Sequence, residues 1–140
     1  APRIPRCARL PGYDGCSAQP PGTHAPMLLI DIGNSRIKAG QHQRGGIHLL
    51  KPCDWRKAQP NDAWCGVLNG LVKPDRIVVS NVAGNAIATA LNAWAEARWQ
   101  MTPTFVKVRA ECAGVRTKYE RPAQLGVDRW LAAIAGWHLT

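Results

Sequence analysis

The order of the short apolar runs constrains the fold of this chain more than any other feature. Three strand-like runs follow one another with short turns between them: MLLIDI (27–32), RIKAGQ (36–41) and GIHLL (46–50). Neighbouring strands joined by so few residues pair antiparallel, because a parallel connection needs about a dozen residues or more. The sequence therefore predicts a sheet that begins with an antiparallel meander of three strands.

Beyond the meander, helical and strand patterns alternate. The expected elements are, in order, a short helix over 63–71, a strand over 75–82, a helix over 83–99, a strand over 104–108 and, after a loop, a last helix over about 126–138. Ile87, Leu91 and Trp94 have the spacing of one helix face. This order predicts an α/β fold in which a mixed five-stranded sheet carries flanking helices. It resembles a half-domain of the actin-like, sugar-kinase and heat-shock ATPase superfamily, which is ribonuclease H-like.

Residues 1–26 differ in composition from the rest of the chain. They are rich in proline, glycine and arginine and show no helical or strand periodicity, so we expect them to be disordered or loosely packed. Met27 opens the first apolar run, which favours a natural start there and a non-native extension before it. A genuine flexible arm is the alternative. We expect residues 27–140 to form one lobe that finishes in the last helix.

The chain carries a formal net charge of +9, from 18 Lys and Arg against 9 Asp and Glu. Such a balance favours anionic partners, and a nucleotide, a small acid and a nucleic acid all satisfy it. The densest basic cluster is interrupted by Glu111 and Glu120, as is typical of a solvated face; its members are Arg109, Arg116, Lys118 and Arg121. A nucleic-acid partner is not expected, because the sequence lacks a helix-turn-helix or RNA-binding signature and no aromatic residues interleave with a basic patch.

The apolar runs and the cysteines argue against a membrane protein and a zinc site. No run approaches the roughly 20 apolar residues that cross a bilayer, and the N-terminal stretch lacks the apolar region of a signal peptide. The five cysteines, which contain no CxxC pair, are Cys7, Cys16, Cys53, Cys65 and Cys112. Neither a closed zinc site nor a disulfide framework is expected from them. We therefore expect a soluble, cytoplasmic protein without a membrane partner.

The first motif, DIGNSRIK (31–38), lies where the first strand turns into the second. Gly33 permits a close approach of the backbone, and successive N–H groups in such a turn point toward an anion. The two residues after it can donate hydrogen bonds to phosphoryl oxygens, and Lys38 supplies positive charge. Asp31 would repel a phosphate by itself, so it is consistent with a hydrated Mg²⁺ that bridges the two. The alternative is structural, because Asp-x-Gly-Asn is also a good hairpin turn of residues that tolerate positive φ.

The second motif, GVDR (126–129), begins the last helix. Free N–H groups and the positive end of the helix dipole favour an anion or a polar ligand there. The Asp128 carboxylate can accept a proton from a substrate hydroxyl, and the Arg129 guanidinium can hold an acceptor in a planar grip. The helix dipole and Arg129 also stabilise the ionised carboxylate, which weakens Asp128 as a base. Phosphoryl transfer does not need a strong base, because the proton is transferred late in the reaction. The alternative is that Asp128 only favours the helix start and Arg129 is solvated.

Together and in this order, the motifs resemble the DxGNS/T-x-x-K and GxDR patterns of type III pantothenate kinases, and the similarity covers about residues 27–138. The resemblance implies that the ATP phosphates contact Asp31, Ile32, Gly33, Asn34, Ser35, Arg36, Ile37 and Lys38, with Mg²⁺ near Asp31. It implies that Asp128 is the catalytic proton acceptor for the pantothenate hydroxyl. It also implies that the pantothenate pocket is lined by Tyr119, Gly126, Val127, Asp128 and Arg129.

The resemblance further implies a reaction and partners. Members of this family use Mg-ATP to phosphorylate pantothenate to 4′-phosphopantothenate, the first step of coenzyme A biosynthesis. They need a monovalent cation, K⁺ or NH₄⁺, and they form homodimers with the pantothenate site near the interface. They also continue beyond the GxDR helix to a second acidic motif, similar to DxGT, that contacts ATP and the monovalent cation.

Because no such segment follows Thr140, we expect little or no activity from this chain, and we expect apolar residues such as Ile134 and Trp137 to be exposed on the last helix. Two other functions stay open at this point. One is an accessory or nucleic-acid-binding regulatory protein, for which the positive charge would be suited. The other is a non-functional fragment of a kinase gene.

Overall fold

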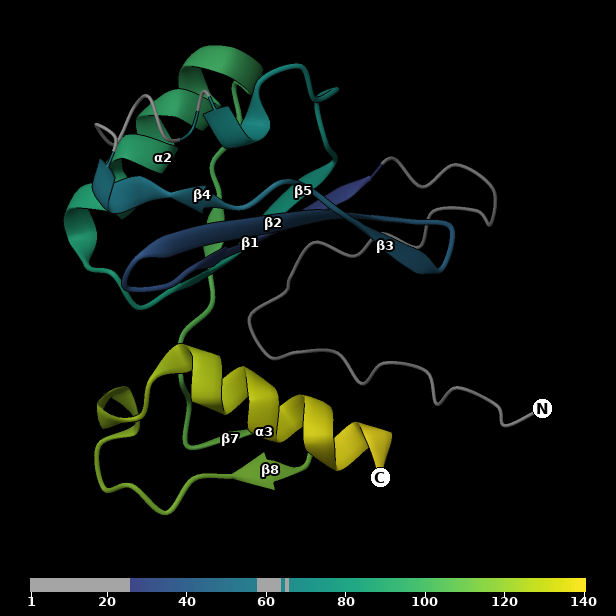
Figure 1. Ribbon diagram of the computed structural model, residues 1–140. Helices are drawn as coiled ribbons and strands as arrows, with labels where there is room; N and C mark the ends of the chain where they lie inside the picture. The colour runs from purple at the N-terminus through teal and green to yellow at the C-terminus, as the bar shows by residue number, and fades with distance from the viewer. Residues whose placement is uncertain (1–25, 58–63, 65) are drawn as a thin grey trace. The chain divides into compact units, whose positions relative to one another are not determined.

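The structure, a computed structural model, describes residues 26–57, 64 and 66–140 (Figure 1). The chain forms two compact units. The larger is Gly22–Lys107, and the smaller includes Val108–Thr140. The expectations for residues 1–26 concern a segment that, apart from Pro26, lies outside the described residues.

The larger unit begins with the predicted meander. Strands β1 (Met27–Ile32), β2 (Arg36–Gln43) and β3 (Gly46–Leu49) pair antiparallel in this order, which confirms the prediction. Arg44 and Gly45 form the connection between β2 and β3, with φ of 46° and 81°. A two-residue turn with positive φ at both positions matches the twist of the strands it joins.

The rest of the sheet is parallel. Strand β5 (Arg76–Asn81) pairs parallel with β1, and β6 (Thr104–Phe105) pairs parallel with β5. The resulting order is β3-β2-β1-β5-β6, so the mixed sheet contains all five predicted strands. A sixth strand, β4 (Cys53–Asp54), pairs with the first residues of β2 and was not predicted. Two residues are too few to show strand alternation in a sequence.

Helices cover one face of this sheet (Figure 1). Alternate residues of β1, Leu28, Ile30 and Ile32, point into the core, as the period of a strand requires. Helix α2 (Asn85–Trp99) packs on them with the buried side chains of Ile87, Leu91, Ala95 and Trp99. Trp64, Val67 and Leu68, which lie in a helical segment, complete the core. The core is therefore one apolar layer between sheet and helices.

Several element limits differ from the prediction. Helix α2 begins at Asn85 because Gly84, with φ of 92°, cannot belong to a right-handed helix. Strand β6 ends at Phe105, although the Val106 N–H still donates to the Val79 carbonyl at 2.9 Å. Of the helix predicted over 63–71, positions 64 and 66–68 are helical, a turn follows, and part of the segment lies outside the described residues.

The smaller unit consists of a hairpin and a helix. Strands β7 (Glu111–Cys112) and β8 (Val115–Arg116) pair antiparallel where a loop was expected. A short 3-10 helix, η2 (Pro122–Gln124), leads to helix α3 (Val127–Leu139), which agrees with the predicted last helix within one residue at each end. The hairpin turn touches α3, because a ring nitrogen of His138 lies 2.9 Å from the Ala113 carbonyl oxygen.

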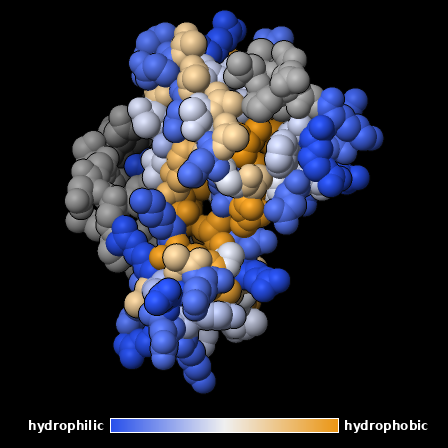
Figure 2. Space-filling model, turned by 90° about the vertical axis from the view of Figure 1, so that its left-hand side faces the viewer, coloured by the Kyte–Doolittle hydropathy of each residue, from blue (hydrophilic) through white to orange (hydrophobic). Residues whose placement is uncertain are grey.

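Apolar residues also reach the surface, as the face drawn in Figure 2 shows. The large exposed ones are Ile47, Leu49 and Val72 in the larger unit and Tyr119, Trp137 and Leu139 in the smaller one. The expected exposure of α3 is confirmed for Trp137, which is 63% exposed, whereas Ile134 is half-buried. In the described part of the chain, no helix has both the length and the apolar character to cross a membrane.

Candidate functional site

The first motif forms a tight turn between β1 and β2. Ile32 and Ile37 are partners in the ladder, and the Gly33 N–H donates to the Arg36 carbonyl at 2.9 Å. Asn34 and Ser35 are thus the two central residues of the turn. The turn has no residue with positive φ, so the conformational reason given above for its glycine and asparagine does not apply. A Cβ on Gly33 would lie 3.4 Å from the Arg36 oxygen, which is an ordinary contact, so neither strain nor crowding within the turn requires the glycine.

Two hydrogen bonds from Trp55 hold this turn, and the sequence analysis did not identify this residue. The indole Nε1–H donates to the Gly33 carbonyl at 2.9 Å, and the backbone N–H donates to the Ser35 carbonyl at 3.2 Å. Trp55 begins the 3-10 helix η1 (Trp55–Lys57), directly after β4 has paired Asp54 with Arg36. A lone tryptophan in the polar stretch CDWRK is the signal that could have indicated it.

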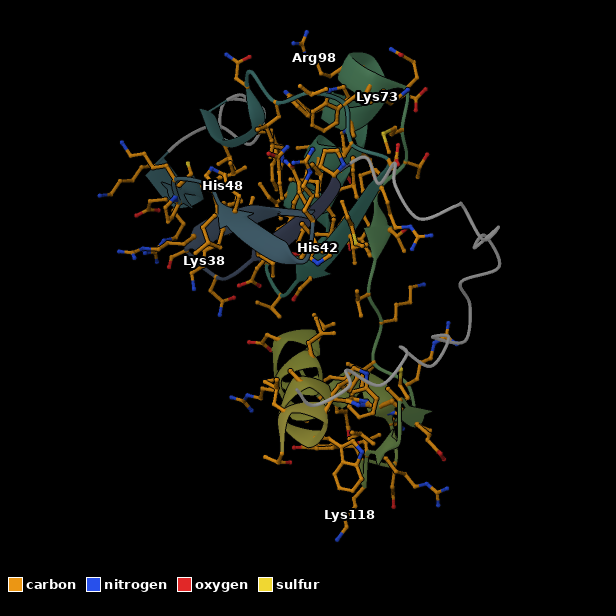
Figure 3. The ribbon with its side chains drawn as sticks, turned by 90° about the vertical axis from the view of Figure 1, so that its right-hand side faces the viewer. Lys38, His42, His48, Lys73, Arg98 and Lys118 are labelled. Atoms are coloured by element: carbon orange, nitrogen blue, oxygen red, sulfur yellow. The ribbon has the colours of Figure 1, made fainter. Side chains whose placement is uncertain are left out.

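Asp31 lies beside the turn in a row of polar residues across three strands. Its ladder partners are Lys38 on β2 and Ser80 on β5, so the three side chains share one face of the sheet, opposite the helices. Lys38 is exposed on this unit (Figure 3). Ser80 is 9% exposed, and its Oγ has no hydrogen-bond partner among the described residues. Within the same residues, no ion pair or hydrogen bond engages the Asp31 carboxylate.

The unpaired Asp31 carboxylate is a hard oxygen ligand of the kind that Mg²⁺ prefers. The described residues contain no group of three His, Cys, Asp or Glu side chains placed to hold a metal ion. Mg²⁺ typically keeps several waters and is held by one or two carboxylates together with substrate phosphates. Asp31 therefore fits a cation that arrives with a phosphate ligand. Of the cysteines, Cys53 and Cys112 are free thiols, and the other three lie outside the described residues.

The second motif places a carboxylate at the beginning of α3. Val127 and Trp130 are buried and anchor the first turn, whereas Asp128 and Arg129 are exposed. The Asp128 Oδ1 accepts a hydrogen bond from the Arg129 N–H at 2.8 Å. A Cβ on Gly126 would lie 2.6 Å from this oxygen, so the carboxylate occupies space that exists only because residue 126 is glycine.

Tyr119 belongs to the same unit as this carboxylate. Its ring is half-exposed, and its backbone N–H donates to the Thr117 Oγ1 at 3.2 Å. Tyr119 and residues 126–129 thus belong to the smaller unit, and residues 31–38 belong to the larger one. Each motif has a defined local geometry: the first is a turn bonded to Trp55 beside the Asp31 carboxylate, and the second is an exposed carboxylate at a helix start.

Comparison with known proteins gives a consistent result. The sequence model of the type III pantothenate kinase family matches residues 27–140. The chain is similar to the type III pantothenate kinase of Nitrosococcus oceani, with 36% identity over 116 residues, which are 78% of this chain and 41% of that protein. It is 34% identical over 119 residues to the type III pantothenate kinase of Alkalilimnicola ehrlichii, which are 80% of this chain and 47% of that protein. It is 38% identical over 115 residues to that of Paraburkholderia xenovorans, which are 81% of this chain and 41% of that protein. The chain spans less than half the length of these relatives.

Proposed function

Because the chain belongs to the type III pantothenate kinase family, we propose that it takes part in the ATP-dependent phosphorylation of pantothenate to 4′-phosphopantothenate, the first step of coenzyme A biosynthesis. The observation that carries the proposal is the family match over residues 27–140, because it includes both motifs. The mixed α/β sheet with its flanking helices is consistent with the actin-like half-domain expected for this family.

In this proposal, the turn after β1 binds the ATP phosphates. Backbone N–H groups of the turn and the Lys38 ammonium face phosphoryl oxygens, and the full binding segment is Asp31, Ile32, Gly33, Asn34, Ser35, Arg36, Ile37 and Lys38. Asp31 would hold Mg²⁺, directly or through its water shell. A cation held there would supply positive charge against the charge that develops on the phosphoryl group.

Asp128 is the proton acceptor in this proposal. Its Oδ1 is engaged by the Arg129 N–H, whereas its Oδ2 has no hydrogen-bond partner in the described structure, so Oδ2 is free to receive a hydroxyl proton. The hydroxyl oxygen of pantothenate bonds to the γ-phosphorus as the bond to ADP breaks, and the hydroxyl proton moves to Asp128. Tyr119, Gly126, Val127 and Arg129 would line the pantothenate pocket.

Further parts of the proposal rest on the family resemblance alone. They are a requirement for K⁺ or NH₄⁺, a homodimer, and a cytoplasmic location. The net charge of +9 would suit a nucleic acid, but the sequence lacks a nucleic-acid-binding signature, so this alternative is not proposed.

The proposal is tested by measuring 4′-phosphopantothenate formation and, by calorimetry, the binding of pantothenate and Mg-ATP to the purified chain in K⁺ buffer. We expect any turnover to be low, because proximity and positioning supply most of this catalysis and the chain spans under half of its relatives. Asp128→Asn should abolish turnover and leave Mg-ATP binding intact. Asp75→Asn, at an exposed carboxylate outside both motifs, is the matched control. A chain that binds neither substrate, or turnover that survives Asp128→Asn, would sink the proposal.

A further inference from the structure

We propose that Trp55 is a positioning residue of the phosphate-binding turn, and that its indole N–H sets the direction of the Asn34 backbone N–H offered to the phosphates. The inference rests on the proposed function, since it assigns a role within the same nucleotide site. Trp55 lies outside both motifs, 22 residues from Gly33 in the sequence. Its hydrogen bonds, and not its place in the sequence, join it to the turn.

Two carbonyl groups of the turn are engaged from one side by a single residue. The Gly33 carbonyl accepts from the Trp55 Nε1 at 2.9 Å, and the Ser35 carbonyl accepts from the Trp55 backbone N at 3.2 Å. The distances are those of ordinary N–H···O hydrogen bonds. Half-burial of Trp55 reduces competition from water for its bond to Gly33.

Through the geometry of the peptide bond, these hydrogen bonds also fix the direction of N–H groups on the side of the turn that faces away from Trp55. In a trans peptide the C=O of one residue and the N–H of the next point in opposite directions, and all described peptides here are trans. Fixing the Gly33 carbonyl toward Trp55 therefore turns the Asn34 N–H away from Trp55. In the same way, the bond at the Ser35 carbonyl turns the Arg36 N–H away. The Asn34 N–H is thereby held in the orientation that an anion bound on the other side of the turn requires. The Arg36 N–H points across the hairpin, as its carbonyl does, which accepts the Gly33 N–H.

The brace also explains why the turn can be ordered without special backbone conformations. It contains no positive φ, and its internal closure is the bond from the Gly33 N–H to the Arg36 carbonyl. That bond leaves the Gly33 carbonyl without a partner inside the turn, and the indole supplies one. A turn organised before its ligand arrives loses less conformational entropy on binding, which favours tight binding of the phosphates.

Strand β4 places Trp55 where it can do this. The pairs Arg36–Asp54 and Ile37–Cys53 attach β4 to the first residues of β2, immediately after the turn. The next residue, Trp55, is thereby set beside the turn. Such a short strand adds little to the sheet, and its position is consistent with a role in presenting the tryptophan.

The test compares Trp55→Phe, which removes the indole N–H and keeps most of the ring, with Trp94→Phe. Trp94 is also half-buried but packs edge-on against Trp99 and makes no hydrogen bond within the described structure. Calorimetry with Mg-ADP and, separately, with pantothenate reads out the two ligands. We expect Trp55→Phe to weaken Mg-ADP binding by about fivefold, the effect of one hydrogen bond, and to leave pantothenate affinity unchanged. Trp94→Phe should change neither.

A second measurement does not depend on a variant. In the unsubstituted chain, the Trp55 indole N–H should give an NMR signal whose exchange with water is slower than that of the exposed Trp137 and whose chemical shift moves on titration with Mg-ADP. Equal Mg-ADP affinity in both variants, or a Trp55 indole signal that exchanges as fast as that of Trp137, would overturn the role of Trp55 alone. Failure of the unsubstituted chain to bind Mg-ADP would instead overturn the proposed function and this role with it.

Discussion

The two motifs are built in opposite ways. The turn at Gly33–Arg36 is held by a residue from a distant segment, through the hydrogen bonds of Trp55. The start of α3 is self-contained: the Asp128 carboxylate is fixed by the next residue's N–H and by the space above Gly126. An arrangement made by consecutive residues can be recognised from the sequence, whereas a hydrogen bond from a distant segment cannot. The comparison predicts that single substitutions inside the second motif have the largest effects.

Gly126→Ala should be the most damaging substitution in the second motif that leaves Asp128 itself unchanged. Gly126 has φ of −62° and ψ of 137°, which alanine adopts freely, so the backbone is not strained. The added methyl group would stand 2.6 Å from the Asp128 Oδ1 and must displace the carboxylate. A shift of about 1 Å in a catalytic group lowers turnover by about 100-fold. Turnover measured beside Mg-ATP affinity, which should not change, checks this prediction.

Gly136→Ala provides the control within the same helix. A Cβ at this position meets no atom within 4 Å, and the residue lies near the end of α3. Alanine is the better helix former by up to about 1 kcal/mol, so this variant should melt at a slightly higher temperature and keep its turnover. Equal turnover in the two alanine variants would show that Gly126 does not position Asp128.

The same contrast explains how much the sequence could predict. Strands β1, β2, β3 and β5 and helices α2 and α3 were predicted because each carries enough residues to show its own period, and β6 was predicted because it begins the longer run 104–108. Strands β4, β7 and β8 have two residues each and show none. Their positions depend on pairing with another segment, which local patterns do not encode.

The candidate site divides along the same line. Asp31, Lys38 and Asp128 were predicted as site residues because they occur in compact motifs that resemble those of the family. Trp55 and Ser80 were not, because their relation to the first motif arises only when β4 and β5 join the sheet. Within the first motif, the structural alternative invoked positive φ for Gly33 and Asn34, and this reason does not apply, since neither residue has positive φ. The sequence could propose these residues, but the structure was needed to show the hydrogen bonds and strand pairs around them.

Asp31→Asn should have the next largest effect, and it tests the braced side of the comparison. Asparagine keeps the size of the side chain and removes the charge that a cation requires. Interactions with a charged group are stronger than neutral hydrogen bonds, so Mg-ADP affinity should fall by about tenfold or more, and the loss should be smaller when ADP is added without Mg²⁺. Calorimetry with and without Mg²⁺ measures this. An equal loss in both conditions would mean that Asp31 does not act through the cation.

Ser80→Ala should have the smallest effect, which is on the free energy of unfolding. Whether this variant is more or less stable tells whether the Ser80 hydroxyl has a hydrogen-bond partner. The Ser80 hydroxyl is buried beside Asp31, and it has no hydrogen-bond partner in the described part of the chain. A buried hydroxyl that lacks a partner destabilises the folded state, so its removal should leave the free energy of unfolding unchanged or raise it by up to about 1 kcal/mol. Denaturant unfolding of the two chains in the absence of nucleotide measures the difference.

A variant that is less stable by more than about 1 kcal/mol would show that the hydroxyl has a partner in solution, such as a buried water bridging it to the Asp31 carboxylate. In that case the row of side chains across β2, β1 and β5 would be a connected polar network, and Asp31 would be braced through the sheet as the turn beside it is braced by Trp55.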